Sequence, residues 1–192
     1  MARRLLVIAY AATAGARGLV FGGGNGEVVG EVPVLSERVA GWVCGPEPAG
    51  AGTAARLGGG AEVEVMAELR DCDFGSWSGL TLDDVGTRDP DALARWLADP
   101  RARPHGGESL AELVDRAGRA IDKRPWPDGR SVAVVPPLVA RAVTVHALGA
   151  APEVIFRVDV APLGRVLISR STGGWRLQGL SRPESRPPRR SR

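Results

Sequence analysis

Short apolar runs alternate with helix-type patterns along most of the chain. Residues 131–135 read SVAVV, the continuous apolar run of a strand that is buried on both faces, and residues 4–9 form a similar run. Residues 109–121 have helical spacing and open with a capping box of Ser109 and Glu112. This alternation predicts a three-layer α/β/α sandwich with a mostly parallel central sheet.

The other expected elements fit between these. Strands are predicted at residues 39–44, 61–65, 154–160, 165–171 and 175–180, and helices at residues 53–57, 82–85, 91–97 and 139–148. Gly173 and Gly174 join the last two strands as a hairpin. The GGGNG stretch at 22–26 lacks a P-loop lysine and is expected to be a flexible surface loop. Because ligands of such sheets bind at the carboxyl ends of the strands, residues after Ala9, Cys44 and Val135 should surround one crevice.

Length and charge indicate one domain and a tail. The 192 residues suit a single domain, taken as residues 1–180. Residues 181–192 hold five arginines and one glutamate, so the net charge of +3 leaves about −1 on the remaining 180 residues. A Pro/Arg/Ser tail of this kind is expected to be disordered. Since the folded body has no basic stripe, a nucleic-acid-binding role is excluded.

Membrane, metal and cofactor roles are also not expected. No apolar run reaches the length of a bilayer span, and the first apolar run is better explained as a buried strand than as a signal peptide. We therefore expect a cytoplasmic protein. Cys44 and Cys72 are interpreted as buried thiols, and with only His105 and His146 available no metal site is predicted.

Four segments together resemble a known family. They are LRDCDFGSWSGLTLDDV (69–85), PHGGESL (104–110), SVAVVPPLVARAVTVHALG (131–149) and VDVAPLGRVLI (158–168). In these the chain, from residue 4 to residue 180, resembles the histidine phosphatase (phosphoglycerate-mutase-like) superfamily. The resemblance implies a nucleophilic histidine at the end of the first strand, a second histidine after a late strand, two phosphate-binding arginines and a carboxylic acid that protonates the leaving oxygen.

Matched position by position, the chain departs from that set. The first motif reads Ala9-Tyr10-Ala11, with tyrosine at the nucleophile position. The arginine position of the next loop falls on Ala49, or on Ala51 with a small shift, and the late motif reads Val135-Pro136-Pro137. The phosphohistidine mechanism is therefore expected to be absent, because a phosphate removed from water needs charged, hydrogen-bonding partners.

Two positions implied by the resemblance are kept. Asp71 stands at the general-acid position and Thr13 at the threonine of the first motif, while Glu68 is a weaker candidate acid. Without cationic neighbours the pKa of Asp71 should be raised by desolvation, so Asp71 and Tyr10 form a candidate acid–base pair.

The functional hypothesis from the sequence is a non-phosphatase member of the fold, with an apolar remodelled pocket for acid/base chemistry on a neutral small metabolite: isomerisation, cyclisation or dehydration. The alternative is a catalytically inactive pseudophosphatase that acts as a binding or scaffold protein. In the first case Asp71 and Tyr10 are catalytic. Residues expected to bind the substrate are Thr13, Ala9, Ala49, Pro136, Pro137 and His105.

Competing structural interpretations accompany these assignments. Tyr10 could fill the void of the lost site, Asp71 could cap a backbone turn, and His105 could be an exposed loop histidine. Trp77 and Trp96 are expected near the crevice, in a cap or in the core. Between the glycine-rich loop and the second strand only residues 32–39 are available, too few for the long helix that the resemblance implies there. The sheet flank left uncovered in this way predicts a homodimer.

Overall fold

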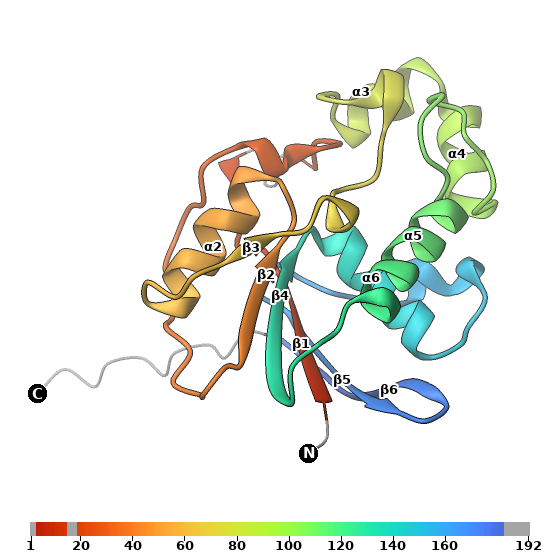
Figure 1. Ribbon diagram of the computed structural model, residues 1–192. Helices are drawn as coiled ribbons and strands as arrows, with labels where there is room; N and C mark the ends of the chain where they lie inside the picture. The colour runs from red at the N-terminus through yellow and green to blue at the C-terminus, as the bar shows by residue number, and fades with distance from the viewer. Residues whose placement is uncertain (1–2, 15–18, 183–192) are drawn as a thin grey trace, which may run out of the picture.

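Strands that are apolar along their whole length form the centre of the molecule. The computed structural model describes residues 3–14 and 19–182. In this part of the chain six strands form one sheet in the order β3-β2-β4-β1-β5-β6 (Figure 1). The strands are β1 (Arg3–Ala9), β2 (Gly41–Cys44), β3 (Glu64–Val65), β4 (Gly129–Val135), β5 (Arg165–Ser171) and β6 (Gly174–Ser181).

The sheet is mostly parallel, as predicted. β4 pairs in parallel with both β1 and β2, and β2 pairs in parallel with β3. β5 and β6 are antiparallel and form the predicted hairpin at one edge. The carboxyl ends of β1, β2 and β4 therefore lie at the same edge of the sheet.

Alternate residues of β1 face two different cores, because successive side chains of a strand point to opposite faces. Leu5 and Val7 pack in the larger core, which includes α5 (Leu110–Lys123) and α6 (Pro137–Ala147). Leu6 and Ile8 pack in the smaller core with α2 (Pro48–Gly58). Helices thus cover both faces of the sheet, and the predicted three-layer α/β/α fold is confirmed.

Capping explains where two of the helices begin. Thr81 accepts the Asp84 N–H at the start of α3 (Leu82–Arg88), and Asp84 accepts the Thr81 N–H in return. Ser109 and Glu112 form the same reciprocal box at the start of α5, as the sequence predicts. α4 (Pro90–Ala98) follows α3 and carries Trp96 on its buried face.

The strand predicted at residues 154–160 is wrong. The chain there forms a 3-10 helix, η4 (Pro152–Arg157), with Pro152 in its first turn. A proline fixes φ near −65°, which favours the start of a helix. Ile155 is buried in the larger core and Val158, three residues on, packs against it, a spacing that matches one 3-10 turn.

Shorter elements also differ from expectation. α2 begins at Pro48, five residues before the predicted helix, and β3 keeps only two of the five predicted residues. The GGGNG stretch contains a 3-10 turn, η1 (Gly23–Asn25). Two further 3-10 turns are η2 (Ala67–Leu69) and η3 (Gly75–Trp77).

Residues 32–39 contain no helix or strand, in line with the shortness noted in the sequence. Val32, Leu35 and Val39 nevertheless pack against the smaller core. From residue 183 onward, the tail predicted to be disordered lies outside the described residues. None of the helices within the described ranges is both long and apolar enough to cross a membrane.

His146 links α6 to α5 on the outer side of the larger core. Its Nε2 lies 3.0 Å from Asp122 Oδ2, and Arg170 of β5 pairs with the other oxygen of the same carboxylate at 2.5 Å. The imidazole rests directly on Gly118 of α5, where an added Cβ would lie 2.2 Å from Nδ1. Gly118 is therefore required by close packing between the two helices.

Replacing Gly118 with alanine should destabilise the protein, although alanine is the better helix former. The new methyl group displaces the imidazole, and we expect the free energy of unfolding to fall by about 1–3 kcal/mol in urea melts. Gly86→Ala in α3 is the matched control, because its Cβ would meet only Leu93 Cδ2 at 3.5 Å. That control should be neutral or stabilising by up to about 1 kcal/mol. Equal stability of Gly118→Ala and wild type would contradict the packing argument.

Candidate functional site

The candidate site lies where β1, β2 and β4 end. Tyr10 follows β1 and donates its backbone N–H to Val135 O at 2.9 Å, and Gly45 after β2 donates to Val134 O at 3.0 Å. The parallel ladder thus continues one residue past each strand, and the loops that begin at Ala11, Pro46 and Pro136 share one region. The strand ends therefore converge as the sequence predicts, while an open ligand crevice between them stays a prediction.

The Tyr10 side chain is buried at these strand ends. It is 4% exposed, and its hydroxyl oxygen reaches Gly24, where an added Cβ would lie 2.8 Å away. Ala9 and Ala49 are fully buried, Pro136 is buried and Pro137 is half-buried. Burial is the main cause that raises the pKa of Tyr10 above its ordinary value, and the nearby carboxylates of Asp71 and Glu47 add to it. Tyr10 therefore stays neutral at physiological pH.

Thr13 holds the glycine-rich loop in place. Its side chain is fully buried, and its hydroxyl donates to Gly23 O at 2.8 Å. Thr13 also forms an isolated antiparallel bridge with Val28. The structure thus places Thr13 beneath the loop, while the substrate-binding role predicted for it stays a prediction.

Asp71 is half-buried at the side of Tyr10. Its backbone N–H donates to Glu47 Oε1 at 2.6 Å, and its Oδ1 accepts the Cys72 N–H at 2.9 Å. Burial raises the pKa of Asp71 to about 7, opposed by the Cys72 hydrogen bond; Glu47 raises it further, and Arg116 and Glu108 act in opposite directions. A carboxyl group with this pKa carries its proton for a large part of the time at neutral pH.

Glu47 is a neighbour of Asp71 that the sequence did not indicate. It lies at the N-cap of α2, between Pro46 and Pro48, and it contacts Asp71 across 24 residues of sequence. Its Oε2 is buried and has no hydrogen-bond partner in the described structure. Only the tertiary fold brings it to Asp71, so no local pattern signals its role.

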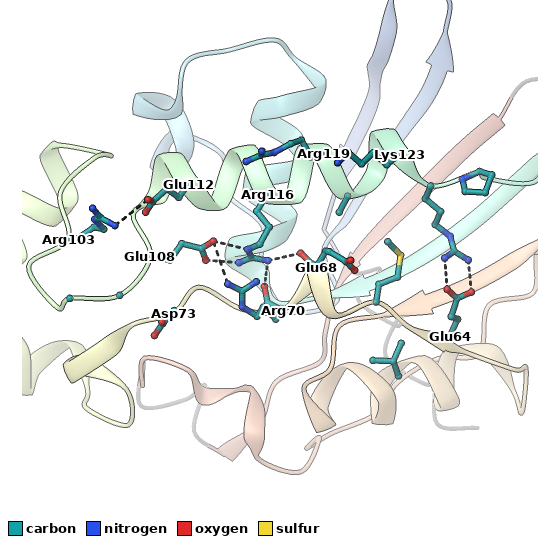
Figure 2. Close-up of a pocket in the computed structure, with 17 residues that line it drawn as sticks. Glu64, Glu68, Arg70, Asp73, Arg103, Glu108, Glu112, Arg116, Arg119 and Lys123 are labelled. Carbon is teal, nitrogen blue, oxygen red and sulfur yellow. Dashed lines mark hydrogen bonds and ion pairs between the residues drawn. The ribbon is translucent and has the colours of Figure 1, made fainter.

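Arg116 fixes the segment that carries Asp71. From the middle of α5 it donates to the carbonyl oxygens of Glu68, Arg70 and Asp71, at 2.6, 3.1 and 3.2 Å. Its Nε and Nη2 also form two hydrogen bonds to the carboxylate of Glu108, at 2.7 and 2.6 Å (Figure 2). All five N–H donors of one guanidinium are therefore engaged.

A charged groove of about 900 Å³ lies along the other side of this segment. It runs between α5 and residues 64–73, and its walls carry the ion pairs Arg103–Glu112 and Arg124–Glu64 (Figure 2). Tyr10, Glu47 and Asp71 do not line it. The groove is thus separate from the crevice at the strand ends.

His105 lies under an aromatic cluster and is 3% exposed, so it is not an exposed loop histidine. Its ring centroid is 5.0 Å from that of Trp77 and 6.3 Å from that of Trp96. Its Nδ1 accepts the Gly107 N–H at 3.0 Å, so the neutral ring carries its proton on Nε2. Trp77 and Trp96, 7% and 4% exposed, are core residues of this cluster.

Metal ligation finds no support in the described ranges, where no three His, Cys, Asp or Glu side chains are grouped to hold an ion. Cys44 and Cys72 are free and buried, as predicted. The Cys72 thiol donates to Glu108 O at 3.3 Å. Burial is the largest cause that raises the pKa of both thiols, so neither is a ready nucleophile.

Removing Arg116 should loosen the Asp71 segment. Its side chain is 14% exposed and that of Glu108 is 10% exposed. Breaking such a pair leaves a buried carboxylate uncompensated, and we expect Arg116→Ala to lower the free energy of unfolding by about 3–5 kcal/mol. Arg119→Ala, one turn along α5, removes an exposed pair with Asp115 and should cost less than about 1 kcal/mol. Similar losses of unfolding free energy in both variants, measured by chemical denaturation, would contradict the role of Arg116 in holding the Asp71 segment.

His105 should make the fold sensitive to acid. Burial lowers its pKa, with Asp73 opposing, whereas the unfolded chain binds the proton near the ordinary value of about 6.5. The unfolded state therefore binds more protons, and this contribution to stability is lost as the pH falls below about 6.5. In His105→Asn, whose amide oxygen can replace Nδ1, the free energy of unfolding should decline less between pH 7 and pH 5. Parallel declines in the two proteins would contradict this.

Known proteins of similar sequence match only part of the chain. A bifunctional protein of Mycobacterium tuberculosis is 40% identical over 62 residues, which are 32% of this chain and 17% of that protein. A glucosyl-3-phosphoglycerate phosphatase of Mycolicibacterium vanbaalenii is 39% identical over 67 residues, which are 34% of this chain and 30% of that protein. The matches thus span less than a third of the length of these relatives.

Solved structures match over nearly the whole chain. The native structure of a mycobacterial glucosyl-3-phosphoglycerate phosphatase has a TM-score of 0.75 at 22% identity, covering 93% of this chain and 98% of that one. The α-ribazole phosphatase of Shigella flexneri has a TM-score of 0.73 at 17% identity, covering 92% and 95%. At these identities the likeness establishes the fold.

These names correct the functional hypothesis drawn from the sequence. A non-phosphatase acid/base enzyme, or a pseudophosphatase scaffold as its alternative, is contradicted by sequence relatives and structural neighbours that are named phosphatases. The hypothesis equated the loss of certain side chains with the loss of a reaction class.

The family itself is shown by the sequence over most of the chain. A model of the histidine phosphatase superfamily (branch 1) matches residues 37–182. This range includes Glu47, Asp71, Glu108 and Arg116, which are joined by the hydrogen bonds described above. The protein belongs to the histidine phosphatase superfamily.

Proposed function

We propose that the protein hydrolyses a phosphomonoester, with Asp71 as the acid that protonates the leaving alcohol. The observation that carries the proposal is the state of Asp71: it is fixed by Glu47 and the Cys72 N–H, with a pKa raised to about 7. A general acid is most effective when its pKa lies near the working pH. The phosphatase names of the relatives support the same reaction class.

The reaction is proposed to proceed without a phosphohistidine. Tyr10, Ala49 and Pro136 stand where the superfamily resemblance implies histidine and arginine. Water is then the nucleophile: its oxygen forms the new P–O bond as the ester P–O bond breaks. The leaving oxygen takes the Asp71 proton, the attacking water gives up a proton to solvent, and Asp71 is reprotonated from solvent. The products are the free alcohol and inorganic phosphate.

Electrostatics favour the singly charged form of the substrate. Residues 9–11, 45–49 and 135–137 contain no arginine, lysine or histidine, while Glu47 lies beside Asp71. A phosphate dianion is repelled there, and the second pKa of a phosphate ester is about 6. Lacking the cationic donors that stabilise a transferring phosphoryl group, the protein should turn over slowly.

The direct test is phosphate release from a panel of phosphomonoesters, including glucosyl-3-phosphoglycerate, phosphoserine and α-ribazole phosphate. We expect release that falls as the pH rises through about 7, because Asp71 loses its proton there. Asp71→Asn should reduce the rate by about 10²–10⁴-fold, the usual contribution of a positioned general acid.

Asp73→Asn is the matched control, since Asp73 lies two residues away on the same loop, is exposed, and accepts the Gly75 N–H, which an asparagine oxygen can also accept. It should keep the wild-type rate. Acid-labile label on the protein after incubation with ³²P-substrate would show that a phosphohistidine forms. No release above buffer with any ester, at any pH from 5 to 8, would remove the proposed function.

We also propose, from the sequence, that the protein is cytoplasmic, forms a homodimer and binds a small molecule. A phosphomonoester is the small molecule that this function requires. The dimer is tested by light scattering at micromolar concentration, where a monomeric mass would exclude it.

A further inference from the structure

We propose that Glu47 is the positioning residue for Asp71, holding its backbone and supplying the uncompensated negative charge beside its carboxyl group. The proposal rests on the function proposed above only in naming Asp71 as the acid. Glu47 is not one of the positions that were matched to the superfamily in the loop after β2.

The contact between the two residues is direct. Glu47 Oε1 accepts the Asp71 N–H at 2.6 Å, at the short end of the range for a charged acceptor. Arg116 of α5 binds the same stretch of backbone, since its Nη2 donates to the Asp71 carbonyl oxygen at 3.2 Å. Asp71 is thus held on its amide side by Glu47 and on its carbonyl side by Arg116.

Two glycines leave room for the Glu47 side chain. A Cβ added to Gly45 would lie 2.5 Å from Glu47 Oε2, and one added to Gly24 would lie 3.2 Å from Glu47 Cγ and 2.8 Å from the Tyr10 hydroxyl. Larger residues at either position would displace the carboxylate or the phenol. The loop after β2 and the glycine-rich loop are therefore shaped around Glu47.

Glu47 forms no ion pair with the described residues. Its Oε2 is buried with no partner in the described part of the chain, and no cationic side chain pairs with it in the described ion pairs. It lies at the N-cap of α2, an 11-residue helix whose dipole favours a negative charge at this end. The hydrogen bond from the Asp71 N–H is the one polar contact of the Glu47 carboxylate among the described residues.

The other charged groups around Asp71 largely cancel. Arg116 from α5 lowers the pKa of Asp71, but it is paired with Glu108, which raises it. Tyr10, at the end of β1, and Cys72 stay neutral because burial raises the pKa of each. Glu47 is the remaining charge, and it raises the pKa of Asp71 against the hydrogen bond from the Cys72 N–H, which lowers it.

Substitution separates the two roles of Glu47. Glu47→Gln keeps the oxygen that accepts the Asp71 N–H and removes the charge, whereas Glu47→Ala removes both. We expect Glu47→Gln to keep a Tm near that of wild type and Glu47→Ala to lower it. Glu68→Gln is the matched control: Glu68 is exposed, stands three residues before Asp71, and is not among the groups that shift its pKa.

The decisive measurement is an NMR titration of the Asp71 carboxyl carbon in full-length protein labelled with ¹³C-aspartate, with the resonance assigned from Asp71→Asn. We expect the titration midpoint to move to lower pH in Glu47→Gln and to stay unchanged in Glu68→Gln. Glu47→Asp, which withdraws the charge by one methylene, should give a midpoint between those of wild type and Glu47→Gln. If phosphate release is observed, its pH midpoint should move in the same direction.

The titration needs no turnover, so it separates this proposal from the proposed function. If no phosphate is released but the Asp71 titration midpoint moves in Glu47→Gln, the role of Glu47 is supported and the proposed phosphatase activity is rejected. A wild-type midpoint in Glu47→Gln overturns the charge role, even if phosphate release is normal. Should Glu47→Gln fail to fold, a wild-type midpoint in Glu47→Asp would overturn it instead.

Discussion

The arrangement of the site depends on the guanidinium of Arg116. Three backbone carbonyls of residues 68–71 and the carboxylate of Glu108 engage all five of its N–H groups. The segment between η2 and η3 has little regular structure, so its own backbone cannot hold it in place. A planar fork with five donors can fix several carbonyls at once, which a lysine ammonium cannot do. Asp71 therefore faces Tyr10 because α5 holds the segment that carries it.

Holding the loop in this way also determines the charge of the crevice. Arg116 is the cation nearest to Asp71 among the groups that shift its pKa, and its charge is balanced by Glu108. What remains at the strand ends is the Glu47 carboxylate, the neutral Tyr10 phenol and the Asp71 carboxyl group, whose pKa is raised to about 7. A site of this kind donates a proton readily and attracts an anion poorly. Within the proposed function, leaving-group protonation is the step that the chain is built to perform.

The sequence predicted those parts of the structure that depend on local pattern. The apolar run at 131–135 and the capping box of Ser109 and Glu112 are local signals, and both elements were correctly located. The apolar stretch at 154–160 was misassigned, because a proline-led 3-10 turn and a short strand bury similar residues. In the candidate site, a motif indicated Asp71, whereas no pattern indicated Glu47 or Arg116. Their partners lie 24 and 45 residues away, and only the fold brings them together.

The same distinction explains why the functional hypothesis failed. Motif positions record which side chains are present, and Tyr10, Ala49 and Pro136 stand where the resemblance implies histidine and arginine. They do not show what the rest of the reaction requires. Phosphoryl transfer passes through a loose transition state, in which bond breaking to the leaving oxygen runs ahead of bond formation. An acid that protonates the leaving oxygen therefore acts where much of the negative charge of the transition state develops. In addition, a monoanionic ester needs fewer cationic side chains around its phosphate than a dianion. The retained Asp71, with Glu47 beside it, is therefore compatible with slow phosphomonoester cleavage in a crevice that has no cationic side chain at the matched positions.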